Sequence, residues 1–277
     1  MWAFTSVVEE YAAVAEPFLL GDPVRNTVPL TVLADLRAGL PVKDPLLGWW
    51  TSGGELRGAV FRTPPHPVGL FAVPVEAVAP LVEALDGDLP SAVGPPEVAA
   101  EVVRLLGPPS RTVSERLYLL EELAVPDVPG RGRAAVPGDF PLLVSWYHAF
   151  GLEVDRGDSG DVVERVARRL AARELFIWED DGAPVSLAAL SAPCGGVCRI
   201  GPVYTPPSRR RRGYGAAVTA YASQYGVDHH HARIVLFTDL NNPTSNAIYQ
   251  SIGYRPVTDY THLTYTNPRP RDRESTA

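Results

Sequence analysis

The sequence predicts an α+β protein made of two similar halves. In both halves, helix-like and strand-like segments follow one another in the same order. A segment rich in proline and glycine, Val125 to Arg133, separates the halves and is typical of a linker. The repeated order indicates an internal repeat on the scale of a domain, and an unrelated α+β domain in the first half is the alternative.

Hydrophobic periodicity and turn residues give the elements of each half. In the first half we expect helices over 7–19, 24–38, 75–85 and 96–106, and strands over 48–51, 58–62, 68–73 and 117–123. In the second half we expect helices over 139–149, 161–173, about 214–225 and from about 243, and strands over 175–179, 185–190, 197–205, 233–239 and 260–266. Gly53-Gly54 and Asp181-Gly182 are the expected turns of two hairpins.

Composition limits the classes of partner. The 277 residues are 45% hydrophobic and 21% charged, as expected for a globular protein, and the net charge of −7 disfavours DNA, RNA or an anionic membrane. The N-terminus lacks the pattern of a signal peptide and no apolar run is long enough to span a bilayer, so we expect a cytoplasmic protein. The sequence leaves the oligomeric state open, a homodimer included.

The cysteines and histidines of the sequence do not form the pattern of a metal site. The two cysteines, Cys194 and Cys198, are too few and too close for a secreted disulfide framework. Three consecutive histidines, 229–231, cannot all face one ion from a helix end, so we expect no metal and interpret them as polar residues at the end of a helix.

The most informative segment is Arg209-Arg210-Arg211-Arg212-Gly213-Tyr214-Gly215-Ala216, between a predicted strand and a predicted helix. Glycines there let the backbone approach a ligand, and the free N–H groups and positive dipole end of a helix favour an anion. With the adjacent guanidiniums, they predict a site for phosphate. A run of arginines is otherwise a solvated face, and the fingerprints of dinucleotide and nucleoside triphosphate sites are incomplete here.

Two further segments accompany this loop. Pro202 interrupts the preceding strand, and because proline cannot donate to a sheet it predicts an edge, a bulge or a splayed strand, with simple strand termination as the alternative. After the loop, Asn242 and Pro243 are suited to a helix start, and Gly253 to its end. The same helix carries Asn246 and Tyr249, which lie near one another on one face.

Two motifs resemble those of the GNAT acyltransferases: Arg210-x-x-Gly213-x-Gly215, and Asn242-x-x-Ser245-Asn246-Ala247-x-Tyr249-x-x-x-Gly253-Tyr254. The resemblance implies two tandem α+β domains, each a mixed, mostly antiparallel twisted sheet flanked by helices. It gives a degenerate copy at 1–125, a linker at 126–133, a working copy at 134–267 and a flexible tail at 268–277. The first copy continues Pro74-Val75-Glu76 after its strand, without glycine or arginine, so we expect it not to bind coenzyme A.

The resemblance also assigns acetyl-coenzyme A as acyl donor and Tyr249 as proton donor to the departing thiolate; the alternative is a core tyrosine bonded to a backbone carbonyl. The positions it implies for coenzyme A binding are Val203, Tyr204, Thr205, Arg210, Arg211, Arg212, Gly213, Tyr214, Gly215, Ala216, Asn242 and Asn246. A backbone N–H of the Val203 segment would polarise the thioester carbonyl.

We therefore expect an N-acetyltransferase that acts on a small-molecule amine by direct attack in a ternary complex. The alternatives are a coenzyme-A-binding regulatory module without turnover and an acyltransferase that acts on a protein or aminoacyl-tRNA. The strand before the loop carries Arg199 and none of the carboxylates that many family members use as general base. Candidates for that role lie elsewhere: Glu153, Asp155, Asp158, Asp161 and His148.

Overall fold

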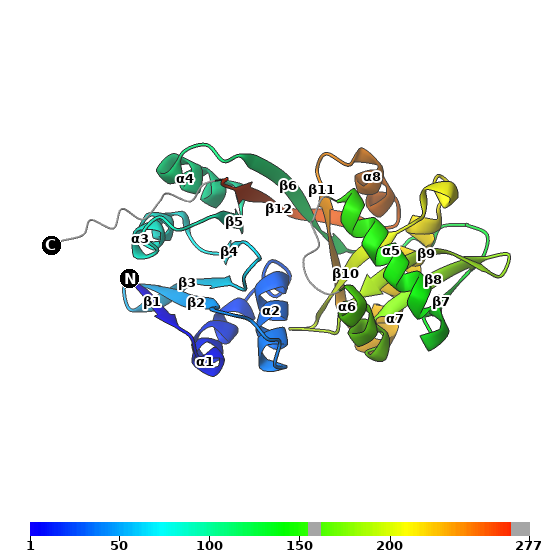
Figure 1. Cartoon of the computed structure of the whole chain (residues 1–277), viewed down its shortest axis with the longest axis horizontal. Coiled ribbons are helices and arrows are strands. Elements are labelled where there is room, and N and C mark those ends of the chain that lie inside the picture. The colour runs from blue at the N-terminus through cyan, green and yellow to red at the C-terminus, as the bar shows by residue number, and fades with distance from the viewer. Residues whose placement is uncertain (155–161, 267–277) are drawn as a thin grey trace. The chain divides into compact units, whose positions relative to one another are not determined.

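The computed structural model describes residues 1–154 and 162–266 (Figure 1). Contacts divide the chain into two units: unit 1 holds Met1–Arg116 together with the described residues from Thr258 onward, and unit 2 holds Leu117–Val257. The predicted tail at 268–277 lies outside the described residues, and the domain boundaries expected from the sequence remain predictions.

The order of elements occurs twice along the chain, as the sequence predicted. The first half contains β1 (Trp2–Thr5), α1 (Val8–Leu19), α2 (Thr27–Arg37), β2 (Leu46–Ser52), β3 (Glu55–Arg62), β4 (Val68–Ala72), η1 (Val75–Ala77), α3 (Val78–Ala84), β5 (Ser91–Gly94), α4 (Pro96–Leu106) and β6 (Arg111–Leu120). The second half contains β7 (Arg131–Ala134), η2 (Pro137–Asp139), α5 (Phe140–Glu153), α6 (Val162–Ala171), β8 (Leu175–Asp180), β9 (Ala183–Leu190), β10 (Val197–Tyr204), η3 (Pro207–Arg209), α7 (Tyr214–His230), β11 (Arg233–Asp239), α8 (Pro243–Ser251) and β12 (Tyr254–Thr264).

Each unit contains a mixed, mostly antiparallel sheet flanked by helices, which confirms the predicted fold class. The strand order is β1-β2-β3-β4-β5-β12-β6 in unit 1 and β12-β6-β11-β10-β9-β8-β7 in unit 2. One described pair in each unit is parallel, β4 with β5 and β10 with β11. The long strands β6 and β12 contribute residues to both units.

Local sequence explains the hairpins and helix ends. Asp181 and Gly182 join β8 to β9 with φ of 49° and 72°, the left-handed conformation that a tight hairpin requires. Gly253 ends α8 with φ of 102°, and a Cβ at this position would lie 1.8 Å from the carbonyl oxygen of Glu122. No residue other than glycine fits there.

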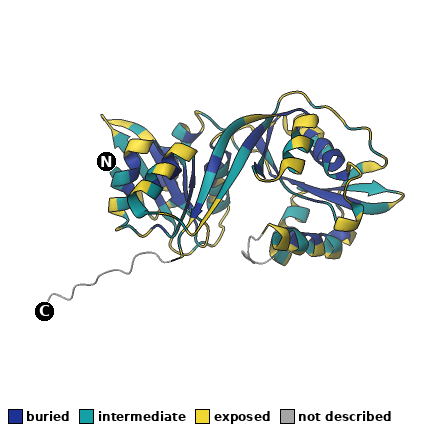
Figure 2. Ribbon diagram, turned by 90° about the horizontal axis from the view of Figure 1, so that it is seen from above, coloured by how far each residue is buried: buried dark blue, intermediate teal, exposed yellow. Residues whose placement is uncertain are grey.

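Two layers of side chains form the core of unit 2, one on each face of its sheet. Phe176, Cys198 and Ile200 pack with residues of α7, whereas Leu175, Ile177 and Leu187 pack with residues of α5 and α6. In Figure 2 the strands and the inner faces of the helices are buried, and the outer faces of the helices are exposed. The sheet therefore carries α7 on one face and α5 with α6 on the other.

Candidate acyl-transfer site

The loop after β10 leads directly into the open end of a helix. Arg211 and Gly213 adopt positive φ, 63° and 81°, and α7 begins at Tyr214. Among the described residues, no side chain caps this end of α7. The N–H groups of its first turn are therefore available to a ligand, at the positive end of a helix of 17 residues. The loop and helix start have the geometry that the sequence predicted, and anion binding there remains a prediction.

The two glycines of the loop have different structural roles. Gly213 is left-handed, and a Cβ on it would lie 2.7 Å from Cγ2 of Val128, so both its φ and its packing require glycine. At Gly215 a Cβ would have only Thr205 Oγ1 within 4 Å, at 3.5 Å, which is ordinary contact. A small side chain therefore fits at Gly215 without disturbing the loop.

Of the three arginines expected to bind coenzyme A, Arg210 forms hydrogen bonds within the chain, whereas Arg211 and Arg212 have no ion-pair partner among the described residues. Arg210 donates from Nε to the carbonyl oxygen of Thr205 at 2.8 Å and from Nη2 to both carboxylate oxygens of Glu153 at 2.6 Å. Arg211 and Arg212 are exposed, and no described residue forms an ion pair with either of them. Arg210 and Glu153 are 57 positions apart, and no sequence pattern predicted that they would pair.

The strand before the loop separates from its parallel neighbour. β10 pairs with β11 from Val197 to Ile200, and no pair follows in the described register. It continues beside β9 through Val203 and Tyr204, with a register shift after Ile200. Pro202 lies in this shift, so the predicted bulge and splay are confirmed. The backbone of the 201–205 segment follows the point where the pairing of β10 with β11 ends and leads toward the loop.

The remaining residues expected near coenzyme A are anchored within unit 2. Tyr204 is buried, with its ring centroid 6.1 Å from that of Trp146. Thr205 Oγ1 lies 2.8 Å from Ser186 Oγ, and the buried Tyr214 donates from its hydroxyl to Asp180. Ala216 is buried against the α7 core. For these positions the backbone, not the side chain, is left to contact a ligand.

Asn242 and Asn246 hold the start of α8 in place. The side chain of Asn242 accepts from the N–H of Ser245 at 3.0 Å and so caps the helix, as predicted. Asn246 donates from Nδ2 to the carbonyl oxygens of Asp239 and Asn242, at 2.9 and 2.8 Å. Its Oδ1 accepts from the hydroxyl of Tyr118 at 2.8 Å. The visible role of both asparagines is structural, and direct contact with coenzyme A remains a prediction.

Tyr249 is half-buried, and its hydroxyl differs from that of the neighbouring Tyr254. Its ring packs edge-on against Tyr254, with centroids 6.2 Å apart, and burial raises its pKa to about 12. The hydroxyl of Tyr254 lies 2.7 Å from Ser223 Oγ, whereas no described group forms a hydrogen bond with that of Tyr249. The backbone carbonyl partner expected of a simple core tyrosine is not found in the described structure.

The structure narrows the candidates for nucleophile and general base. Cys198 is fully buried, and burial raises the pKa of its thiol to about 11, so it is not an activated nucleophile. Glu153 is paired with Arg210. His148 is exposed on α5, and Asp155, Asp158 and Asp161 lie outside the described residues.

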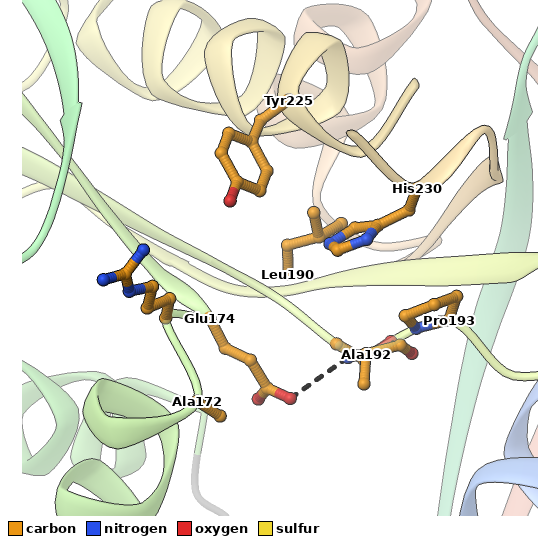
Figure 3. Close-up of a pocket in the computed structure, with 9 residues that line it drawn as sticks. Ala172, Glu174, Leu190, Ala192, Pro193, Tyr225 and His230 are labelled. Atoms are coloured by element: carbon orange, nitrogen blue, oxygen red, sulfur yellow. Dashed lines mark hydrogen bonds between the residues drawn. The ribbon is translucent and has the colours of Figure 1, made fainter. Parts of the chain in front are cut away.

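The described residues show neither a metal cluster nor a membrane-spanning helix. No group of three or more His, Cys, Asp or Glu is arranged to hold a metal within residues 1–154 and 162–266. In the same ranges no helix is both long and apolar enough to cross a bilayer. A cavity of about 280 Å³ lies at the other end of α7, between Glu174, Ala192, Tyr225 and His230 (Figure 3). It is separated from the loop by the length of the helix.

The sequence profile of the acetyltransferase (GNAT) family matches residues 142–254. This range contains α5 to α8, and with them the loop and the separated strands described above. The chain carries a GNAT acetyltransferase domain. This domain identifies an acyltransferase, and the GNAT family generally uses acetyl-coenzyme A as donor. No curated protein sequence matches the chain.

Solved structures extend the similarity to both halves. A GNAT-family acetyltransferase from Colwellia psychrerythraea shares 10% identity at a TM-score of 0.65, over 96% of this chain and 99% of that one. A GCN5-related N-acetyltransferase from Sphaerobacter thermophilus shares 15% at 0.65, over 95% and 94%. A tandem GNAT protein from the clavulanic acid biosynthesis pathway shares 12% at 0.56, over 95% and 98%. At such identities the likeness shows the fold, and the repeated element order is consistent with a tandem GNAT protein whose N-terminal copy is degenerate.

Proposed function

We propose that this chain moves an acetyl group from acetyl-coenzyme A to the amine of a small molecule, by direct attack in a ternary complex. The observation that carries the proposal is that β10, whose pairing with β11 ends at Ile200, leads through the loop into the uncapped start of α7. The start of α7 would bind phosphates through backbone N–H groups, and β10 beyond Ile200 offers backbone to an extended acyl-pantetheine arm.

The residues present fit coenzyme A in charge as well as in shape. The first-turn N–H groups of α7, together with Arg211 and Arg212, would hold the pyrophosphate. The segment from Val203 to Thr205 would bind the arm. Acetyl-coenzyme A supplies the activated thioester, and the chain orients it and keeps a neutral phenol, Tyr249, within the same core cluster as Val203.

A phenol is protonated at neutral pH, and burial of Tyr249 favours this state further by raising its pKa. With a pKa of about 12 the phenol is protonated throughout the neutral range, so it can donate a hydrogen bond to a developing thiolate. The same exclusion of water would raise the pKa of a thiolate beside it and so favour the transfer. Because the thiol of Cys198 is buried and protonated, an acetyl-cysteine intermediate at this residue is disfavoured.

The test is transfer of radiolabelled acetyl from acetyl-coenzyme A to a panel of amines: polyamines, amino sugars, amino acids and arylamines. We expect label in one class of amine, intersecting initial-velocity lines and no acetylated protein by mass spectrometry. Binding of coenzyme A with no transfer to any amine would favour the regulatory module instead. Label on a protein or an aminoacyl-tRNA, with binding that weakens steeply with salt, would favour the macromolecular acceptor.

A further inference from the structure

The bulge in β10 is held from outside the sheet by Arg169 of α6. Beyond Ile200, β10 has left β11 and its register beside β9 has shifted, so the ladder no longer fixes this backbone. Pro202 has no N–H, and Gly201 has φ of 149°, a value that other residues rarely adopt. An unpaired carbonyl in such a partly buried segment costs about 1–3 kcal/mol.

Arg169 supplies the missing partner. Its Nη1 donates to the carbonyl oxygen of Gly201 at 2.8 Å and lies 3.3 Å from the hydroxyl of Tyr147, which is buried. The side chain of Arg169 is only 19% exposed. The contact therefore joins α6 to the one part of β10 that the sheet leaves without regular pairing.

The arginine is itself fixed in position. Its Nε lies 3.7 Å from Oε2 of Glu174, whose side chain is 20% exposed. The other oxygen of Glu174 accepts from the N–H of Ala192 at 3.1 Å, the bond drawn as a dashed line in Figure 3. Glu174 also accepts through its backbone carbonyl from Leu190, the residue of β9 that pairs with Ile200. The carboxylate thus links the guanidinium to β9 just before the bulge.

We propose that Arg169 is a positioning residue for acetyl transfer: by holding the Gly201 carbonyl on the α6 side of β10, it orients the following 203–205 backbone toward the thioester. This inference rests on the proposed function, which places the thioester carbonyl at that backbone. Arg169 does not contact the pyrophosphate loop, so its loss should misplace the reacting end of the donor while the phosphate end still binds. A misplacement of 1 Å can lower a rate about 10²-fold.

The experiment compares Arg169→Met and Arg169→Lys with the control Arg168→Met. Arg168 is the exposed neighbour on the same helix, and no described side chain contacts it. Three quantities are measured: coenzyme A affinity by calorimetry, kcat and KM for acetyl transfer, and the infrared carbonyl band of bound acetyl-coenzyme A labelled with ¹³C. The band reports polarisation of the thioester and needs neither acceptor nor turnover.

For Arg169→Met we expect coenzyme A affinity within about twofold of wild type, a loss of kcat of about 10–100-fold, and a band moved toward that of free acetyl-coenzyme A. Arg169→Lys should be intermediate in kcat and in the position of the carbonyl band. An ammonium lacks the planar fork that reaches Gly201, Tyr147 and Glu174 together. Arg168→Met should match wild type. If Arg169→Met does not fold, the positioning role of Arg169 is judged from the kcat and the carbonyl band of Arg169→Lys.

An unchanged band and kcat in the folded variant would overturn the role of Arg169, and so would a loss of coenzyme A affinity in step with kcat. Failure of the proposed function gives a different result. Wild-type protein would then fail to bind acetyl-coenzyme A, or would bind it and transfer nothing, whereas the infrared comparison would still report on Arg169 in the second case.

Discussion

The two halves of the chain differ most at the junction between the third strand of the meander and the next helix. In unit 2, β10 is followed by a turn with two left-handed residues and then by the uncapped α7. In unit 1, β4 is followed after two residues by η1, which runs on into α3, a helix of 7 residues. Pro74 precedes η1, and no residue from Val73 to Ala77 has positive φ. Neither helix start has a side-chain cap, so the two junctions differ in the turn, and we expect an anion site only in unit 2, where left-handed residues precede the helix.

The parallel strands of the two units differ as well. β4 pairs with β5 at Val68 and Gly69, and two residues later the ring of Phe71 lies 4.8 Å from that of Tyr260 on β12. Tyr260 is buried, and its hydroxyl donates to the carbonyl oxygen of Arg25 at 3.0 Å. An aromatic pair thus packs where β4 leaves β5, whereas the matching segment of β10 carries Val203; Phe71 and Val203 are both half-buried. The two units thus share the parallel pairing and differ in the side chains that follow it.

The largest effect expected from this comparison is the loss of coenzyme A binding in Gly215→Glu. Space at Gly215 accepts a Cβ, so Gly215→Ala should fold and bind, whereas the glutamate places a negative charge at the end of α7 that would meet the pyrophosphate. Calorimetry should give one site per chain in wild type and in Gly215→Ala, and none in Gly215→Glu.

Residual binding in Gly215→Glu would contradict the comparison between the units, and the stoichiometry of wild type would say how. A stoichiometry of two in wild type would mean that unit 1 also binds the ligand. One unweakened site in a folded variant would place coenzyme A elsewhere. Gly213 is the poorer test, because a side chain there would lie against Val128 and adopt a strained φ, and lost binding would follow from a disturbed loop.

The second effect concerns Tyr249, for which we expect Tyr249→Phe to lower kcat by about 10²–10⁴-fold where chemistry limits the rate. The affinity for acetyl-coenzyme A should stay nearly unchanged, and so should the melting temperature, because no described partner loses a hydrogen bond. A folded variant with wild-type turnover would remove Tyr249 from the mechanism. Tyr254→Phe is the matched control: it removes a hydroxyl bonded to Ser223 and should lower stability rather than kcat per folded molecule.

The pH dependence sharpens this prediction. Burial raises the pKa of Tyr249 from about 10 to about 12, so the folded state favours the neutral phenol. The stabilisation is therefore complete below pH 10 and is lost as the pH rises from 10 toward 12. Between pH 7 and 9 the phenol stays protonated, so kcat of wild type should not fall through ionisation of Tyr249. The pH profiles of wild type and Tyr249→Phe should therefore have the same shape in this range. An alkaline decline that disappears in Tyr249→Phe would mean that the phenol ionises in the complex.

The sequence predicted the local geometry of the loop and of the start of α8 better than it predicted the sheet. Glycine and asparagine act locally, so the left-handed turn at Gly213 and the cap at Asn242 could be predicted from a few neighbours. β12 begins at Tyr254 rather than at 260, and β6 at Arg111 rather than at 117. Five of the six added residues of β6 are polar: Arg111-Thr112-Val113-Ser114-Glu115-Arg116. They form a strand because β12 lies beside them in the sheet, and Ser110, just before β6, donates to Thr264.

Three short strands were missed for the same reason. β1, β5 and β7 have four residues each, too few for a hydrophobic period to stand out, and β7 lies within the segment predicted as linker. The contacts of Arg169 with Gly201 and of Arg210 with Glu153 span 32 and 57 positions. Such pairs depend on how α5, α6 and β10 pack, which no local pattern encodes.

The smallest effect is expected from Glu153→Gln, which tests whether the arginine of the loop is shared between the chain and its ligand. In the structure both carboxylate oxygens of Glu153 accept from Arg210, and the two side chains are 41% and 42% exposed. Pyrophosphate would compete with this carboxylate for the guanidinium and be repelled by it. Replacing the carboxylate by a neutral amide of the same size should therefore tighten coenzyme A binding about two- to fivefold, in line with the modest energy of an exposed ion pair. The gain should shrink as salt rises, since screening weakens both interactions.

Glu122→Gln is the control, because it removes the same charge from an exposed carboxylate of unit 2 without a described arginine partner. Weaker binding in Glu153→Gln alone would show instead that Glu153 holds Arg210 in the orientation that the phosphate needs, and the loop of unit 2 would then depend on α5 for its function.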